Sequence, residues 1–446
     1  MQTHVPKDLR DRLALPWIVK KILFFSLKVV DRFNLWKYPY VYDPEKPNIK
    51  MGINLVWKSI HGMTRAEKGS GLEDHFATQE FRGINKLPAG FKPETTISLR
   101  AVGDLMKNPG IQFSRDKFYN NVDELIFGGD IAVANLESML TKENIETTTY
   151  SATKTPKINA TLEDYRALIG HSSRTYDIVC LSNNHALDRG EEGIQTTIAQ
   201  LEEDGIRHFG VNFSPEDTQR CLIHEKNGIK LGFIGFTHSL NRQPFPEGKE
   251  YIVNYLPFHS KKFARERDYS PIKTQITYCK EQGCDLIILT LHWGLEYDFF
   301  PTVAQVEMAR DLAEAGADVI ISHHTHCIQP FEWHECKRDG GRIVPIFYGL
   351  GNLSANKCRP HVVLSLIASI SITRGTTKDG FKMTLVDSVD IVPVFQLEKP
   401  DGDGYYIELQ FLSDMVKEEF NDDSFAQYII QLREYADLIL GTGWNE

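Results

Sequence analysis

The sequence predicts an α/β fold in which mostly parallel β-sheets are flanked by helices. Two observations support this prediction. From residue 96 onward, short apolar runs alternate with amphipathic segments, which is typical of parallel strands joined by helices. Several of these runs also begin at an aspartate and end at a side chain that can bind a metal.

The strands and helices can be placed in chain order. Apolar runs predict strands at Ile97–Val102, Ile131–Leu136, Ile178–Leu181, Leu231–Phe236, Leu286–Leu291, Val319–Ser322 and Ile343–Tyr348. The clearest helix is expected from Pro301 to about Ala315, with proline at its first position and Gly316 as its cap. A second helix is expected from near Gly190 to Asp204–Gly205. Later segments predict two long strands and a helical region: Val362–Thr373, Met383–Phe395 and Leu412–Leu440.

The chain divides into an extension (residues 1–95), a main domain (96–355) and a β-rich and helical completion of that domain (356–446). In the extension, residues 14–36 are amphipathic, because apolar residues such as Phe25 recur at helical spacing between lysines and arginines. The apolar run is shorter than the about 20 residues that a spanning helix needs. Two interpretations stay open: a helix packed on the main domain, or a peripheral helix at the inner face of a membrane.

Composition excludes some classes of function. A formal net charge of -10 argues against a nucleic-acid partner, which would favour a basic face. The seven cysteines form no CxxC pair and are odd in number, so a reduced, cytoplasmic location is expected. Cys327 lies beside a histidine cluster, and we expect it to be a buried, inert thiol rather than a ligand.

One spacing recurs along the predicted strands. Asp130 precedes an apolar strand and Glu137 follows it, and the same pattern leads from later aspartates to later polar groups. These pairs are Asp177 with Asn184, Asp285 with His292, and Asp318 with the cluster His323, His324 and His326. Asp104 closes the first strand. Parallel strands of similar length deliver their closing side chains to one edge of the sheet, where ligand sites form.

These closing residues predict a metal site. They offer carboxylate, amide and imidazole groups without thiolate, a set that suits Mn, Fe, Zn or Mg. The expected ligands are Asp104, Glu137, Asn184, His292, His324 and His326.

The chain resembles the poly-gamma-glutamate capsule-synthesis proteins of the CapA type, a bacterial branch of the calcineurin-like metallophosphoesterases. The resemblance covers about residues 96–355 and rests on these segments: Gly103-Asp104, Asn135-Leu136-Glu137, Asn183-Asn184-His185-Ala186-Leu187-Asp188-Arg189-Gly190, His292-Trp293-Gly294-Leu295-Glu296, His324-Thr325-His326 and Gly349-Leu350-Gly351-Asn352. It implies the layered sandwich of that superfamily and a divalent metal centre of one or two ions.

The resemblance also implies roles. Asp104 would bind the first metal, Glu137 would bridge, and Asn184 and His292 would bind the second, with His324 and His326 completing the two sites. His185 would be the acid beside the leaving group, oriented by Asp188 one helical turn on. Substrate contacts are expected from Asn135, Trp293, Glu296 and Asn352, with packing, second-sphere and turn roles as alternatives.

Two features depart from the superfamily pattern. Met106 stands where a histidine ligand is expected, so the first metal site is weakened or absent. Gly129-Asp130 imitates the motif of the bridging residue, but Asp130 opens its strand, so Glu137 is the preferred bridge.

Three functions follow. The first is a metal-dependent, phosphoesterase-type hydrolase linked to poly-gamma-glutamate or another capsule polymer, acting on a small molecule or polymer that bears phosphate or carboxylate. The second is a metal-dependent amide hydrolase of a glutamyl polymer. The third is a non-catalytic capsule-assembly scaffold with a reduced metal site. Other capsule-synthesis proteins are expected partners.

Overall fold

The computed structural model describes residues 21, 25–26, 49–142, 157–355, 359–402 and 404–445. The predicted amphipathic segment at residues 14–36 falls almost wholly outside these ranges, and so does Cys358. Among the residues described, no helix combines the length and apolar character needed to cross a membrane.

The first sheet joins parallel strands from the middle of the chain to long antiparallel strands from its end. Its order is β18-β17-β16-β1-β2-β7-β8, with β15 paired to β1. The strands β1, β2, β7 and β8 are parallel. On the other side of β1 the pairing is antiparallel throughout, from β1 to β16, from β16 to β17 and from β17 to β18. Their bounds are β1 (Lys92–Leu105), β2 (Ile131–Leu136), β7 (Ile178–Cys180), β8 (Arg207–Phe209), β15 (Asn352–Ser354), β16 (Leu364–Thr376), β17 (Lys382–Asp401) and β18 (Gly404–Phe411).

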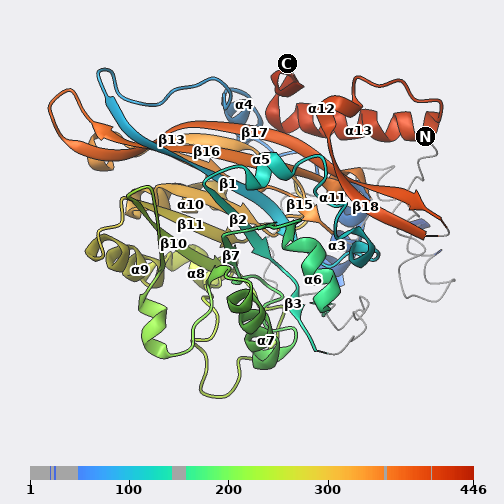
Figure 1. Ribbon diagram of the computed structural model, residues 1–446, viewed down its shortest axis with the longest axis horizontal. Coiled ribbons are helices and arrows are strands. Elements are labelled where there is room, and N and C mark those ends of the chain that lie inside the picture. Colours follow the sequence, from blue (N-terminus) through green and yellow to red (C-terminus); the bar gives the residue numbers. More distant parts are fainter. Residues whose placement is uncertain are drawn as a thin grey trace.

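The second sheet has the order β13-β14-β12-β11-β10-β9. Its inner strands β10, β11, β12 and β14 are parallel, and the edge strands β9 and β13 are antiparallel to their neighbours. The bounds are β9 (Leu222–Lys226), β10 (Ile229–Thr237), β11 (Leu286–His292), β12 (Val319–His323), β13 (Phe331–Glu335) and β14 (Ile343–Phe347). In Figure 1 the long strands β1, β16 and β17 cross the upper half of the molecule, and β10 and β11 lie below them.

Helices cover the outer faces of the two sheets. They are α3 (Ile49–His61), α4 (Leu72–Ala77), α5 (Asp123–Phe127), α6 (Leu162–Leu168), α7 (Gly190–Glu203), α8 (Lys261–Glu266), α9 (Ser270–Glu281), α10 (Val303–Ala315), α11 (Pro360–Val363), α12 (Leu412–Met415) and α13 (Asp423–Leu440). Short strand pairs complete the fold: β3 (Met139–Leu140) with β4 (Asn159–Ala160), and β5 (Gly170–His171) with β6 (Arg174–Thr175).

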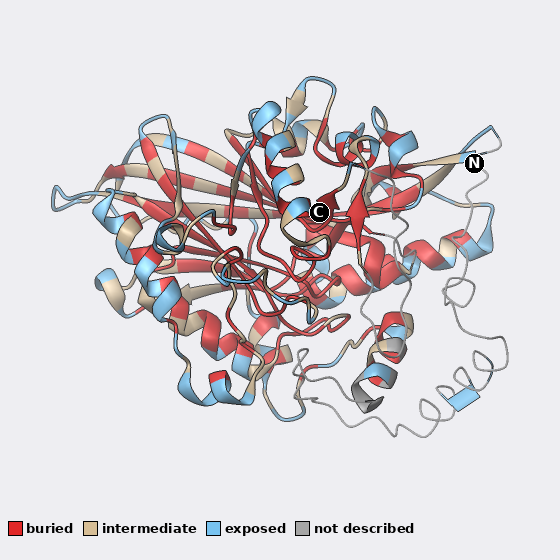
Figure 2. Ribbon diagram, turned by 90° about the horizontal axis from the view of Figure 1, so that it is seen from below, coloured by how far each residue is buried: buried red, intermediate tan, exposed pale blue. Residues whose placement is uncertain are grey.

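Two hydrophobic cores show how the layers pack. On β1, Ile97 and Leu99 face a core shared with the second sheet, whereas Val102 belongs to a core shared with α5, α6 and α7. The two sheets meet directly, since the rings of Phe209 and Phe233 lie 5.8 Å apart. Figure 2 shows buried residues concentrated on the central strands and exposed residues on the outer helix faces. This layered arrangement confirms the predicted α/β class.

The structure corrects several predicted boundaries. The helix expected to begin at Pro301 begins at Val303, because Thr302 is its cap and its side chain accepts a hydrogen bond from the Gln305 backbone. The helical region at residues 412–440 is two helices, α12 and α13. The second of these begins where the Asp422 side chain caps the backbone of Ser424 and Phe425. Strand β1 begins at Lys92, inside the segment expected to be an extension.

The aspartates that open the parallel strands hold the neighbouring strands in register. Asp130 Oδ2 accepts the backbone N–H of Ser98 at 2.8 Å. The other three make the same contact: Asp177 with Ala132 at 2.7 Å, Asp285 with Lys230 at 2.7 Å, and Asp318 with Ile287 at 2.9 Å. Ala132, Lys230 and Ile287 are each the second residue of their strand, whereas Ser98 lies in the middle of the longer strand β1, level with the start of β2. Asp130 therefore lies at the opposite end of the sheet from Asp104 and Glu137, as its spacing indicated.

Candidate metal centre

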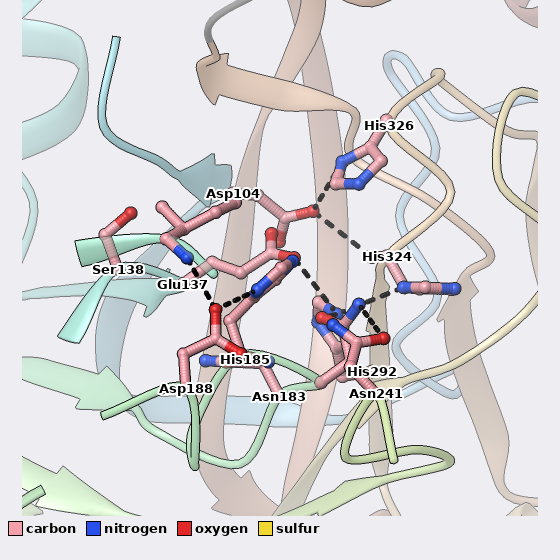
Figure 3. Close-up of polar contacts among 12 residues, drawn as sticks. Asp104, Glu137, Ser138, Asn183, His185, Asp188, Asn241, His292, His324 and His326 are labelled. Atoms are coloured by element: carbon pink, nitrogen blue, oxygen red, sulfur yellow. Dashed lines mark hydrogen bonds and ion pairs between the residues drawn. The ribbon is translucent and has the colours of Figure 1, made fainter. Parts of the chain in front are cut away.

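The predicted ligands converge where β1, β2, β7, β11 and β12 end (Figure 3). Strand register explains the convergence, because Asp104 is paired with Asn135 on β2 and with Asn352 on β15. In the second sheet, His292 is paired with His323. All six predicted ligands are buried: Asp104, Glu137, Asn184, His292, His324 and His326.

Gly103 allows β1 to approach the Gly351 backbone closely. A Cβ atom at Gly103 would lie 2.4 Å from the Gly351 carbonyl oxygen. The same carbonyl accepts the Asp104 backbone N–H at 3.0 Å, which fixes Asp104 at the rim of the sheet. The close approach of the two backbones therefore explains why a glycine directly precedes Asp104.

Asp104 is fully buried and surrounded by donors. Its Oδ1 accepts from Asn135 Nδ2 at 2.8 Å and lies 2.9 Å from His323 Nδ1. Its Oδ2 accepts the His324 backbone N–H at 3.2 Å and lies 3.8 Å from His326 Nδ1. Burial alone would raise the pKa of Asp104, but the nearby imidazoles, His323 first, bring it below its usual value. The carboxylate is held ionised.

Glu137 is the opposite case. Neither of its carboxylate oxygens has a hydrogen-bond partner, although the residue is fully buried. Oε1 lies 3.4 Å from His292 Nε2 and 3.9 Å from His185 Nε2. Burial, followed by the charges of Asp104 and Glu296, raises its pKa well above the usual value. A buried carboxylate without a partner is costly, and a bound cation is one way to satisfy it.

The donor set fits a divalent cation on both sides of Glu137. On one side, the ligand atoms of Asp104, Glu137 and His326 all lie within 4.8 Å of one another. On the other, His292 Nε2 is 2.9 Å from Asn184 Oδ1 and 3.2 Å from His324 Nδ1. Burial lowers the pKa of His292 and His324, which favours the neutral imidazole that metal binding requires.

The backbone at the two histidines is strained. His324 has φ 89° and His326 has φ 54°, values that side-chain-bearing residues seldom adopt. Such a conformation costs about 1–3 kcal/mol and is found most often at functional sites. Here it turns both imidazoles into the space beyond β12, beside Asp104 and His292.

His185 is oriented by a carboxylate. Its Nδ1 lies 2.6 Å from Asp188 Oδ2, and the Ile158 backbone N–H also donates to that oxygen at 2.6 Å. Asn183 Oδ1 accepts the His185 backbone N–H at 3.1 Å. The residues form a turn before α7 rather than the helical turn suggested by their spacing. With Nδ1 engaged, Nε2 is directed toward Glu137.

The four expected substrate residues lie in three different settings. Asn135 holds Asp104, and Asn352 Oδ1 lies 2.8 Å from His326 Nδ1, so both position ligands. Trp293 is wholly buried, and its Nε1 donates to Ser322 Oγ at 3.0 Å, which places it in the packing beneath the site. Glu296 has a buried oxygen without a partner and acts electrostatically on Glu137. Substrate contact by these residues stays a prediction.

Met106 provides no ligand in this arrangement. Its side chain is buried in the core shared by the two sheets, and a thioether is a weak ligand for hard cations. Cys327 is fully buried, and burial raises the pKa of its thiol. The burial of Cys327 agrees with the expected buried thiol.

Two histidines of this region have no counterpart in the predicted set. His238 follows β10, and its Nδ1 donates to the His292 carbonyl at 2.9 Å. Its ring centroid is 4.2 Å from that of His324 and 4.8 Å from that of His259. Burial lowers the pKa of His238 to about 4, so it is neutral near pH 7. Thr237, the last residue of β10, is in register with His292. The position of His238 directly after a strand was therefore the sequence signal that could have predicted it.

Comparison with known proteins identifies the family. The chain is 26% identical over 307 residues to a PGA biosynthesis protein CapA of Bacillus subtilis, covering 67% of this chain and 74% of that protein. It is 23% identical to a capsule biosynthesis protein CapA of Bacillus anthracis, covering 59% of this chain and 61% of that protein. A putative 5'-nucleotidase of Staphylococcus aureus, solved with alpha-ketoglutarate, aligns with a TM-score of 0.37 and 12% identity, covering 77% of this chain and 59% of that one.

A family model supplies the decisive match. The model described as bacterial capsule synthesis protein PGA_cap matches residues 98–357, which is more than half of the chain. The match includes every residue of the predicted metal set. The chain therefore belongs to the bacterial capsule synthesis family PGA_cap, the CapA-type family linked to poly-gamma-glutamate.

Proposed function

We propose that the chain is a metal-dependent hydrolase of the phosphoesterase type that acts in the formation of poly-gamma-glutamate or another capsule polymer. The observation that carries this proposal is the buried, unpartnered carboxylate of Glu137. It lies between an Asp104–His326 group and an Asn184–His292–His324 group. Structural carboxylates at this depth are normally satisfied by the protein itself.

The candidate ligands divide into two groups around Glu137. Asp104 and His326 would hold one cation, and Asn184, His292 and His324 would hold another. Met106 leaves the first position with fewer protein ligands. We therefore propose one tightly bound ion at the second position, with a weaker ion at the first. Mn, Fe, Zn and Mg remain the candidate metals.

When bound, a divalent cation would polarise the scissile group and activate water for its attack. The chain's own residues supply the remaining chemistry. Asp188 Oδ2 lies against His185 Nδ1 and orients the ring, so that Nε2 would give a proton to the leaving oxygen. Asn135 and Asn352 fix the orientation of Asp104 and His326.

A second candidate reaction keeps this site and changes the bond. The relatives that define the family are named for PGA and capsule biosynthesis, so an amide of a glutamyl polymer is a reasonable alternative substrate. Either substrate class bears phosphate or carboxylate, which the cationic centre would attract. A cytoplasmic location, contact with other capsule-synthesis proteins and the lack of a nucleic-acid partner belong to the same proposal.

Metal content and turnover test the proposal together. In purified full-length protein the centre around Glu137 should hold close to one equivalent of divalent metal, measured as the amount lost in His292→Ala. Stripping this metal should abolish hydrolysis of a generic phosphodiester or a glutamyl polymer. His185→Ala should retain the metal but lower turnover by about 10²–10⁴-fold. The matched control is His224→Ala, a histidine on β9 paired with Leu231 near the start of β10.

Two results would contradict the proposal. One is bound metal below a tenth of an equivalent with no uptake on addition. The other is unchanged turnover in His185→Ala on every substrate that the wild-type protein cleaves. The first result would favour the remaining hypothesis, a non-catalytic capsule-assembly subunit.

A further inference from the structure

A second group of metal-capable side chains lies at the other end of the second sheet. Glu314 is in the last turn of α10, His334 is on β13, and Cys336 follows that strand. One ligand atom from each lies within 4.8 Å of the other two. Asp318, next to this group, opens β12, whereas His323 at the end of β12 lies in the first centre. Five strand residues at about 3.3 Å each separate the two places by roughly 16 Å.

The group supplies nitrogen, sulfur and oxygen. His334 Nε2 is a buried atom without a hydrogen-bond partner. It lies 4.0 Å from Glu314 Oε1, too far for a hydrogen bond. Two ligands on a tetrahedral Zn²⁺ are separated by about 3.4 Å, from metal–ligand distances of about 2.0–2.3 Å. A small inward shift of either side chain would bring both into contact with one ion.

The surroundings hold the ligands in place. The backbone N–H groups of Lys337 and Arg338 donate to the Glu314 carboxylate at 2.8 and 3.3 Å, and a carboxylate has further lone pairs available. The Arg338 guanidinium is held by Asp318 at 2.8 Å and by the Ala313 carbonyl at 2.7 Å, and it also interacts with the Cys336 side chain. Arg342 lies 3.2 Å from the same Asp318. The nearby positive charges are therefore paired.

We propose that Glu314, His334 and Cys336 form a second, separate site for a borderline divalent cation, with Zn²⁺ as the best-fitting ion. Zn²⁺ accepts carboxylate, imidazole and thiolate together, whereas Mg²⁺ and Ca²⁺ prefer oxygen alone. Glu314 is about one third exposed, so the ion enters from solvent and water completes its coordination. The bound ion joins the end of α10 to the edge strand β13. The site does not depend on the hydrolase function.

Co²⁺ distinguishes this site from the first centre. A thiolate bound to Co²⁺ gives a charge-transfer band in the near-ultraviolet, and the proposed first centre has no sulfur ligand. Adding Co²⁺ to the metal-stripped, full-length chain should produce this band. Its intensity should stop rising once one Co²⁺ ion is bound at the proposed site of each chain. The band should persist in His292→Ala and disappear in Cys336→Ser. Cys279→Ser, in a separate thiol group with Cys221 and Cys284, should leave it unchanged.

Two further variants keep the thiol and the buried packing around it. Glu314→Gln, at a position about one third exposed, and His334→Ala should each weaken Co²⁺ binding about tenfold or more. Zn²⁺ should raise the Tm of His292→Ala and should not raise that of the double variant with Cys336→Ser. The proposal is overturned by a missing band in the wild-type chain, by a band that survives Cys336→Ser, or by unchanged affinity in both Glu314→Gln and His334→Ala.

Discussion

The two ends of the parallel strands carry the same types of side chain in opposite states. At the start of the strands, the carboxylates of Asp130, Asp177, Asp285 and Asp318 accept backbone N–H groups of the neighbouring strand. At the far end, Glu137 is buried with both oxygens unpartnered. The same end of the strands carries three imidazoles of low pKa: His238, His292 and His324.

The difference separates stability from function. An aspartate that accepts a backbone N–H contributes to folding, and it does so without any ligand. A buried carboxylate without a partner costs folding free energy, and the cost is tolerated where a ligand recovers it. Substitutions at the starting end of the sheet are therefore expected to lower stability and leave activity unchanged. Substitutions at the far end are expected to lower activity and leave stability unchanged.

The largest effect is expected from Glu137→Gln. Loss of the bridging carboxylate should lower turnover by at least about 100-fold, because changes to groups that only support metal ligands already cost up to about that much. The fold should be retained, since no hydrogen bond to Glu137 is lost. Turnover and metal content would be compared with those of Glu225→Gln, an exposed glutamate on β9. Full metal content with wild-type turnover in Glu137→Gln would remove the bridging role.

The same variant has a pH signature in the metal-free protein. The folded-state pKa of Glu137 is raised, so the folded protein keeps a proton that the unfolded chain releases. Its contribution to stability therefore falls as pH rises through the unfolded pKa of about 4.3 toward the folded value. Glu137→Gln should gain stability relative to wild type at the upper end of that window, and urea unfolding at several pH values would measure the gain.

A smaller effect, on stability rather than turnover, is expected from Asp318→Ala. Asp318 accepts from Ile287 at 2.9 Å and pairs with Arg338 and Arg342 at 2.8 and 3.2 Å. Removing it leaves two largely buried guanidinium groups without that partner, a loss of about 3 kcal/mol. Urea unfolding would measure this loss, and turnover per folded molecule should be unchanged. A stable variant with reduced turnover would contradict the comparison between the two ends.

Strand spacing predicted that the candidate ligands converge, because the strands are parallel and their paired ends lie at the same edge of each sheet. The aspartate before a strand accepts a backbone N–H of the neighbouring strand, and the candidate ligand follows the same strand at a fixed offset. Asp130 and Glu137, on either side of β2, illustrate this offset. His238 was not predicted because no aspartate precedes β10. The start of β10 instead donates a hydrogen bond to Asp285, which precedes β11. The group of Glu314, His334 and Cys336 was not predicted because these residues come together only where the end of α10 lies beside β13.

Local rules failed where one side chain decided a boundary. Proline at position 301 predicted the first residue of a helix, but the Thr302 hydroxyl makes the capping bond and shifts the start to Val303. Residues 412–440 were predicted as one helical region, yet the Asp422 side chain caps a new helix within it. Capping geometry depends on backbone conformation, which spacing alone does not specify.

The smallest effect is expected from Asp130→Ala, and it separates two residues that sequence motifs confuse. Asp130 follows a glycine as a bridging ligand would, but it is half-buried at the starting end and accepts from Ser98 N and Oγ at 2.8 and 3.1 Å. Its loss should cost about 1 kcal/mol of stability. Metal content and turnover should match wild type, in contrast to Glu137→Gln. If Asp130→Ala instead lost bound metal, the assignment of Glu137 as the bridge would fail, because the two residues occupy opposite ends of β2.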